Sequence, residues 1–208
     1  MIPPRQLVAY SASHPLLFRP GTSWSYSNTN YILLGLIVEK VTGHSVQQEL
    51  ARRIFQPLGL TQTSFEDRPA VSRQHMAHGY YLGTGTPRDA TDGWSGVTWT
   101  AGAIVSDTRD LARFFAALLG VHLLTGDQLR MMETTVPAAQ DTGYGLGLYS
   151  FPITCGKAWG HGGEMPGYET WVLTSRDGRR VAVVAANAGF SAMGSRVDAI
   201  TDLLYCWH

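Results

Sequence analysis

Two short polar stretches of this sequence carry residue types that can perform acid–base chemistry. One is the Tyr-Ser-Asn tripeptide at residues 26–28, inside "GTSWSYSNTNYILLGLIVEK", and the other is the His-Gly-Gly tripeptide at residues 161–163, inside "KAWGHGG". A phenol and an imidazole can each carry a proton to or from a reacting group, and an amide can hold a substrate by hydrogen bonds. Glycines within a strand indicate a bulge or a close approach by a ligand or another backbone.

Each stretch also has an ordinary structural explanation. The first precedes an apolar run with helical spacing, where the Asn28 side chain would satisfy free backbone N–H groups as an N-cap. The glycines after His161 fit a simple turn at the end of a strand. Considered singly, neither stretch specifies a catalytic site.

Apolar spacing predicts two helices behind the first stretch. The first should run from Asn28 to Val41 and be closed by Gly43. Its expected buried stripe is Tyr31, Leu34, Ile37, Val38 and Val41. A capping-box pair, Ser45 with Gln48, then begins a second helix that Pro57 ends.

The middle of the chain predicts irregular structure followed by further helices. Residues 59–105 show no sustained period, which indicates a long ordered loop region. Helical spacing returns at 108–119, with Gly120 beyond its end, and Thr125 with Gln128 forms another capping-box pair.

The last third predicts antiparallel strands and a closing helix. Aromatic and β-branched runs surround the Asp177-Gly178 pair, which is a strong hairpin signal. Residues 191–205 predict a helix over the resulting sheet. Its expected inner face is Met193, Val197, Ile200 and Leu204. Helices, then strands, then a helix on the sheet indicate an α+β fold.

Composition excludes two classes of function. Sixteen Lys plus Arg balance 16 Asp plus Glu, and this neutral chain lacks the basic excess of a nucleic-acid binder. No stretch reaches the roughly 18 consecutive apolar residues of a membrane span, because Glu39 and Lys40 stop the run "YILLGLIV". The first residues also lack the segments of a secretory signal.

Together, the two polar stretches resemble the motifs of a known family. His-x-Gly on a strand follows Tyr-x-Asn before a helix by 135 positions. This order resembles the serine β-lactamase-like and penicillin-binding family, which includes D-alanyl-D-alanine carboxypeptidases, class C β-lactamases, esterases and D-aminopeptidases. The stretches "RIFQPLGLTQTSF", "WTAGAIVSDTRDLARFFAALL", "GYGLGLY" and "GHGGEMPGYET" are similar to that family too. The resemblance implies a β-lactamase/transpeptidase-like fold, an antiparallel sheet flanked by helices, and no cofactor.

The resemblance also implies roles for individual residues. Tyr26 would be the general base or proton shuttle, and Asn28 would hydrogen-bond the substrate amide. His161 would supply a polar or positive partner near Tyr26. Backbone N–H of Glu164 would be one oxyanion-hole donor. Gly162 and Gly163 would let substrate lie against the strand edge.

The first motif of that family, Ser-x-x-Lys, is absent from these 208 residues. The only lysines are Lys40 and Lys157, and neither lies three positions after a serine. We therefore expect one incomplete catalytic domain with its N-terminal part missing, inactive on its own, or else a non-catalytic binding protein derived from the fold. A third alternative, a hydrolase using Ser27, lacks a neighbouring Lys or His. The expected parts are a mainly helical and loop region, 1–140, and a strand region with the closing helix, 141–208.

Specificity residues point away from a carboxypeptidase. Glu164 would repel a substrate carboxylate, and Tyr149 stands where relatives offer a cation, which favours an esterase, an amidase or an aminopeptidase-like hydrolase. Glu164 would then suit an amine-bearing substrate. Trp99 is either a wall of the pocket or an ordinary core residue. His75 and His78 have a spacing that would suit a metal, but without a third ligand they are expected to be loop histidines, and no metal is expected.

The two cysteines, Cys155 and Cys206, are either buried free thiols or one disulfide. Exported members of the resembled family carry a disulfide at these places, so the resemblance implies a bridge and an extracytoplasmic or secreted bacterial protein. It also implies a sheet completed from both ends of the chain, so an unpaired strand edge should favour homodimerisation or strand exchange. The expected ligand is a small or peptide-like ester or amide.

Overall fold

The structure is a computed structural model that describes residues 2–66, 76–81, 86–91, 98–138, 141–189 and 194–207, with only the backbone described at 189, 194–196 and 198. His75 and Met193 lie outside the part for which side chains are described. The chain forms two compact units. One takes its residues from 1–76 and 94–105, and the other from 77–93 and 106–208.

The first unit is mainly helical. Its elements are α1 (Pro4–Ala12), α2 (Asn28–Thr42), α3 (Val46–Leu50), the π-helical turn η1 (Ala51–Phe55), β1 (Ser64–Phe65), the 3₁₀ turn η3 (Trp99–Ala101) and β4 (Ile104–Val105). Strands β1 and β4 pair antiparallel. The buried core consists of Ile32, Val46, Phe65, Trp99 and Ala103, joined by partly buried residues of α1 such as Leu7.

The second unit is built on a six-stranded antiparallel sheet with the order β10-β9-β8-β7-β6-β5. Its strands are β5 (Val136–Pro137), β6 (Gly143–Tyr144), β7 (Tyr149–Ile153), β8 (Gly156–Met165), β9 (Tyr168–Thr174) and β10 (Val181–Ala186). The helices are α4 (Thr108–Leu119), α5 (Gly126–Glu133) and α6 (Gly194–Cys206). A small sheet, β11-β2-β3, joins Ala188–Gly189, Tyr80–Tyr81 and Arg88–Asp89.

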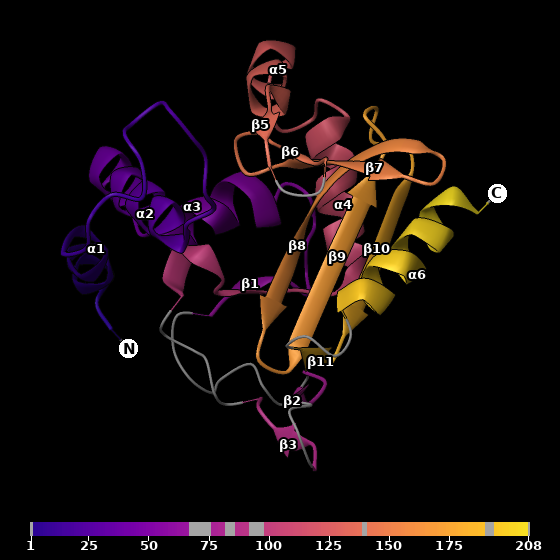
Figure 1. The fold of residues 1–208 in the computed structure, drawn as a ribbon, viewed down its shortest axis with the longest axis horizontal. Coiled ribbons are helices and arrows are strands. Elements are labelled where there is room, and N and C mark those ends of the chain that lie inside the picture. The colour runs from indigo at the N-terminus through magenta and orange to yellow at the C-terminus, as the bar shows by residue number, and fades with distance from the viewer. Residues whose placement is uncertain are drawn as a thin grey trace. The chain divides into compact units, whose positions relative to one another are not determined.

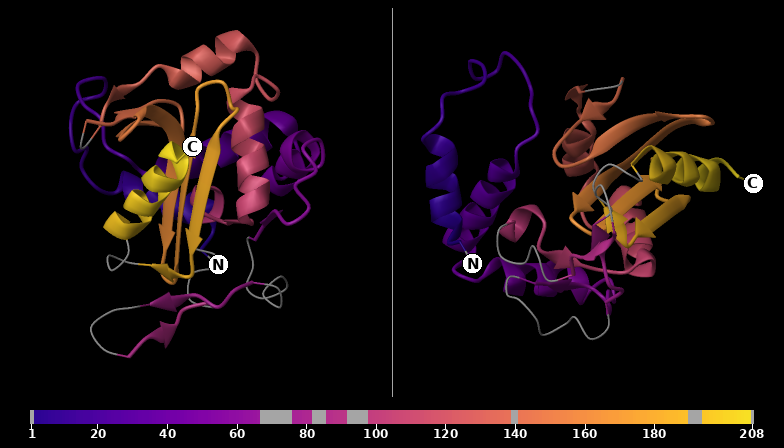
Figure 2. Two further views of the ribbon diagram at one scale, coloured as in Figure 1. Left: turned by 90° about the vertical axis from the view of Figure 1, so that its right-hand side faces the viewer. Right: turned by 60° about the horizontal axis from the view of Figure 1, so that its bottom comes forward.

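Strand alternation gives this sheet two apolar faces, each covered by a helix. In Figures 1 and 2, α6 lies along one face of β9 and β10, and α4 lies on the opposite face. The α4 face packs Phe115 and Leu119 against Trp159 and Val172. Ala158 and Leu173 are the sequence neighbours of Trp159 and Val172, and they face α6 instead. The predicted α+β fold is therefore confirmed.

Most of the predicted helix starts and the hairpin are confirmed. Capping boxes are present at Ser45 and Thr125, and α2 ends at Gly43 in the left-handed region. Gly178, with φ of 72°, closes the β9–β10 hairpin where the Asp-Gly pair predicted it. Residues 59–105 were expected to be a loop, but short strands form within that range: β1 pairs with β4, and β2 pairs with β3 and with β11. Each of these strands is two residues long, too short to show a period in the sequence.

The predicted buried stripes of two helices are wrong at most of their described positions. In α2, Leu34, Ile37 and Val41 are exposed, and Ile32 and Gly35 face the core instead. Among the described side chains of α6, Val197 is buried as predicted, whereas Ile200 and Leu204 are exposed and Thr201 and Tyr205 are buried instead. Both helices carry apolar residues on more than one face, so their spacing alone did not identify the buried one. Within the described ranges, no helix combines the length and apolarity needed to cross a membrane.

Candidate functional site

The residue that caps α2 is Ser27, not Asn28. Its Oγ accepts the Thr29 N–H at 3.3 Å, and its backbone is extended, with φ of −147°. Asn28 is the first helical residue and its side chain is exposed. The N-cap explanation therefore applies to the middle residue of the tripeptide, and neither Tyr26 nor Asn28 is required to start the helix.

The first turns of α2 are held by the η3 turn of the same unit. The Thr100 hydroxyl donates to the Tyr31 carbonyl at 2.8 Å. A Cβ added to Gly35 would lie 2.8 Å from the Trp99 ring, so only a glycine lets the indole approach this closely. Trp99 is buried in the core of its unit and has a left-handed φ of 41°, a strained conformation for a bulky residue. These contacts fix the helix that begins at Asn28.

Tyr26 itself lies before the cap and is 41% exposed. Its ring is 5.7 Å from the ring of Tyr31, one turn into the helix, with an interplanar angle of 31°. The phenol is thus carried by a segment whose conformation is set by the Ser27 cap and the packed helix behind it.

The second motif lies where β8 extends beyond the end of its pairing with β7. Strand β7 pairs with the first half of β8, from Ile153 opposite Gly156 to Tyr149 opposite Gly160, and that ladder ends there. Strand β9 continues alongside β8 as far as Met165. The His-Gly-Gly-Glu segment therefore begins where the β7 ladder stops, which is the arrangement that strand-edge binding of a substrate requires.

His161 contacts polar groups through both ring nitrogens. Its Nδ1 lies 2.5 Å from the Gly162 carbonyl oxygen, and its Nε2 lies 3.3 Å from the Tyr144 hydroxyl. Burial lowers the pKa of the His161 imidazole below its ordinary value of 6.5, and the hydrogen bond to Gly162 opposes that shift. The surroundings of the imidazole therefore favour its neutral form.

The glycines after His161 differ in their surroundings. A Cβ on Gly162 would lie 2.9 Å from the indole of Trp171, its partner on β9, whereas a Cβ on Gly163 would meet no atom within 4 Å. Trp171 packs edge-to-face with Phe151, at 5.4 Å between centroids, and donates its Nε1–H to Glu169. One side of the strand is thus filled by aromatic rings, and the Gly163 position is open.

Glu164 stands directly opposite Glu169 across the β8–β9 ladder. Glu169 is buried, at 4% exposure, whereas Glu164 is exposed. The two acidic side chains are close neighbours, because opposed Cβ atoms of an antiparallel pair lie only about 5 Å apart.

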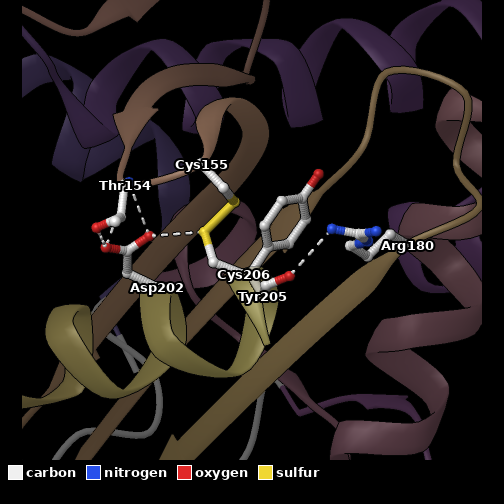
Figure 3. Close-up of a disulfide and its surroundings, with 6 residues drawn as sticks. All are labelled: Thr154, Cys155, Arg180, Asp202, Tyr205 and Cys206. Carbon is white, nitrogen blue, oxygen red and sulfur yellow. Dashed lines mark hydrogen bonds between the residues drawn. A yellow bond between two sulfur atoms is a disulfide. The ribbon is translucent and has the colours of Figure 1, made fainter. Parts of the chain in front are cut away.

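The predicted disulfide is confirmed. Cys155, in the turn between β7 and β8, is bonded to Cys206, the last residue of α6 (Figure 3). Among the described residues, no cluster of three or more His, Cys, Asp or Glu is placed to hold a metal. His78 instead pairs with Asp89 on β3, at 2.6 Å between Nδ1 and Oδ2.

Tyr144 was not predicted from the sequence to contact His161. It belongs to the stretch "GYGLGLY", where the short strand β6 turns into β7, and only the strand register reveals that its hydroxyl reaches His161. Tyr26, Asn28 and Trp99 belong to the first unit. Residues 161–164 belong to the second. The convergence of the two sets on one cavity stays a prediction.

This chain is similar to two solved amide-cleaving enzymes and to a curated penicillin-binding protein. A D-stereospecific amidohydrolase from Streptomyces sp. superposes with a TM-score of 0.91 and 33% identity, over 99% of this chain and 62% of that one. A D-amino acid amidase from Ochrobactrum anthropi gives 0.86 and 25%, over 97% of this chain and 62% of that one. Penicillin-binding protein 4* of Bacillus subtilis is 29% identical in an alignment 185 residues long that covers 82% of this chain and 41% of that protein.

The chain therefore spans less than half of the curated relative and about three fifths of each solved one. A sequence profile for the family described as Beta-lactamase matches residues 2–206, nearly the whole chain. The resemblance inferred from the motifs is thus confirmed, and this protein belongs to the Beta-lactamase family, whose members are serine hydrolases.

Proposed function

We propose that this chain supplies the Tyr-x-Asn and His-x-Gly parts of a serine hydrolase site that cleaves an ester or amide through an acyl-enzyme. The observation that best supports the proposal is the capping of α2 by Ser27 alone. Helix formation does not account for Tyr26 and Asn28, whereas substrate and proton handling does. The end of the β7 ladder at Gly160 supports the same function for the second motif.

In this proposal each residue has a distinct task. Tyr26 accepts the proton of the nucleophile and then donates a proton to the leaving group. Asn28 holds the substrate amide by hydrogen bonds. The N–H of Glu164 donates to the oxyanion, while Gly163 leaves room for the substrate backbone. His161 provides a further hydrogen-bonding group for the substrate.

The acylating residue is the part that these 208 residues do not provide. Because Ser-x-x-Lys is absent from the sequence, we propose that the chain alone neither acylates nor turns over substrate. The competing function is a non-catalytic binding protein derived from the fold, and the same missing motif favours it. A Ser-x-x-Lys motif encoded directly upstream of Met1 would support the hydrolase, and an upstream region without one would support the binding protein.

Charge at the end of β8 favours an amine-bearing substrate over one with a terminal carboxylate. Glu164 is exposed at this end of the strand, and a substrate carboxylate brought beside it would be repelled. An amide or ester of an amino acid with a free amino group fits this end of the strand. In a complete enzyme, Glu164→Lys should shift the preference from amine-bearing towards carboxylate-bearing substrates, and an unchanged preference would contradict the assignment.

The hydrolase proposal is tested first by covalent labelling. The chain is incubated with a fluorescent penicillin and with p-nitrophenyl butyrate, and we expect neither labelling nor turnover. Labelling of the chain alone would show that a nucleophile is present and would overturn this part of the proposal. Ser27→Ala would then identify or exclude Ser27 as that nucleophile.

Convergence of the two motifs is tested by a double-mutant cycle on binding. Affinity for a D-phenylalanine amide is measured by calorimetry for the parent chain, Tyr26→Phe, His161→Gln and the double variant. Residues that touch the same small molecule should show a coupling free energy above about 0.5 kcal/mol. Additive effects, with measurable binding by the parent, would place the two residues in separate environments and contradict a shared cavity.

We further propose that β10 associates with β10 of a second copy of this chain. β10 is the terminal strand of the six-stranded sheet, and its residues, Val181–Ala186, are uncharged. An edge strand without charge or proline readily pairs with another, and identical antiparallel strands can do so about a twofold axis. Ala185→Lys, at an exposed position, should lower the dimer fraction seen by light scattering, and a monomeric parent chain at high concentration would contradict the proposal.

An extracytoplasmic location also belongs to the proposal. The Cys155–Cys206 disulfide supports it, because such bonds persist mainly in oxidising compartments. Fractionation of the native host with thiol alkylation would test it, since a reduced pair in the cytoplasmic fraction would contradict both export and the bridge.

A further inference from the structure

We propose that Tyr144 is a positioning residue that holds His161 as its Nδ1–H tautomer, with Nε2 accepting a hydrogen bond from the Tyr144 hydroxyl. This inference rests on the proposed function, since it specifies the form in which His161 enters that site. The two side chains belong to β6 and β8, within one compact unit.

The position of the proton follows from the groups around the ring. The Gly162 carbonyl oxygen can only accept a hydrogen bond, and Nδ1 lies 2.5 Å from it, so Nδ1 must carry a proton. In the neutral imidazole, Nε2 is then an acceptor, and the Tyr144 hydroxyl 3.3 Å away can donate to it. The opposite tautomer would set two lone pairs against each other at Gly162.

Tyr144 is well placed to fix this arrangement, because its own position is fixed. The residue is 7% exposed and pairs with Val136 of β5 on one side and Tyr149 of β7 on the other. Its ring packs edge-to-face with that of Tyr149, at 4.3 Å between centroids. The hydroxyl therefore reaches His161 from a packed strand, with little freedom to turn away.

The ring of His161 is also held from a second direction. The Tyr149 and His161 centroids are 5.1 Å apart, and Val172 faces His161 across the β8–β9 ladder. Burial of the imidazole lowers its pKa below the ordinary value, which favours the neutral ring to which this tautomer belongs.

A neutral His161 changes the chemistry proposed for the site. The imidazole can then accept and donate hydrogen bonds in a fixed direction, but it brings no positive charge to stabilise a Tyr26 phenolate. Cationic help for Tyr26 has to come from another group, such as the lysine of a Ser-x-x-Lys motif. Tyr144 thereby contributes to the site through His161, without touching the substrate.

The test is a pH titration of the histidine side chains by long-range ¹H–¹⁵N NMR, on the intact chain. His161→Gln identifies the His161 signals by their loss. We expect the neutral parent to carry its proton on Nδ1. Tyr144→Phe keeps the ring and removes the donor to neutral Nε2, so the pKa of His161 should rise by about half to one unit.

Tyr149→Phe is the matched control, since it removes a hydroxyl from the adjacent ring of the same cluster. It should leave the pKa of His161 within about 0.2 units of the parent, well below the shift expected for loss of a hydrogen bond. A proton on Nε2 in the parent, an unchanged pKa in Tyr144→Phe, or an equal rise in both variants would each overturn the proposal. None of these results depends on hydrolysis, so they are independent of the labelling assay.

Discussion

Cys155 and Cys206 join the turn after β7 to the last residue of α6, 51 positions further along the chain (Figure 3). Polar contacts reinforce this junction. Asp202, one turn earlier in α6, accepts the Thr154 N–H at 3.1 Å, and the Arg180 guanidinium lies 5.6 Å from the centroid of the Tyr205 ring. The C-terminal end of the helix is thus fixed to the sheet whose face it covers.

Removing the disulfide should destabilise the chain. In the chain-entropy model, a bridge that closes a loop of this length stabilises the folded state by about 3 to 4 kcal/mol. The double variant Cys155→Ser, Cys206→Ser should lose about that free energy of unfolding in urea titrations. Reduction of the parent should produce a similar loss, and two free thiols in unreduced, denatured parent protein would contradict the bridge.

Two adjacent glycines of β8 should respond differently to a methyl group. At Gly162 a Cβ would lie 2.9 Å from the Trp171 indole, whereas at Gly163 it would meet nothing within 4 Å. Gly162→Ala should therefore cost about 1 to 3 kcal/mol through overpacking, and change the tryptophan fluorescence. Gly163→Ala should stay within about 0.5 kcal/mol of the parent. Equal losses of stability in the two variants would mean that the strand backbone, and not contact with the Trp171 indole, disfavours a side chain at these positions.

Signals that act over a few residues predicted the framework of the fold. The Ser45–Gln48 and Thr125–Gln128 pairs and the Asp-Gly turn formed as expected, because each is completed by atoms within its own segment. The buried face of α2 was not predictable in this way. It depends on Trp99, which packs on Gly35 from 64 positions away in the sequence.

The same distinction applies to the candidate site. His161 and the glycines after it could be proposed as site residues from the sequence, since they form one contiguous motif. The partnership of His161 with Tyr144 depends on the registers of β6, β7 and β8, in which a slip of one residue would turn every side chain to the other face. Register is set by packing across the sheet, so the sequence did not reveal this contact.

The assignment of the α2 cap to Ser27 predicts unequal effects for two neighbouring substitutions. Ser27→Ala removes the oxygen that accepts the Thr29 N–H and should lower the free energy of unfolding by about 1 kcal/mol. Asn28→Ala leaves that bond in place and should change it by less than about 0.5 kcal/mol. A larger loss for Asn28→Ala, by thermal or urea unfolding, would return the capping role to Asn28.

Acid should weaken the fold through Glu49, whose buried carboxylate joins the ends of α3 and η1. It accepts hydrogen bonds from Arg53 at 2.5 Å and from Arg52 at 2.9 Å, and it pairs with His44 at 2.9 Å. These contacts, with that of Arg53 the largest, lower the pKa of Glu49 from 4.5 to about 2.

Because the pKa of Glu49 is lower in the folded than in the unfolded chain, its contribution is fully present above pH 4.5 and is lost as the pH falls towards 2. Glu49→Gln should therefore unfold more readily at pH 7 and show a flatter pH dependence of stability across that window. Arg53→Gln, which keeps the carboxylate and removes its strongest partner, should flatten the dependence only in part. Urea titrations between pH 2 and 7 measure both effects, and an undiminished slope in Glu49→Gln would show that other carboxylates are responsible for the acid sensitivity.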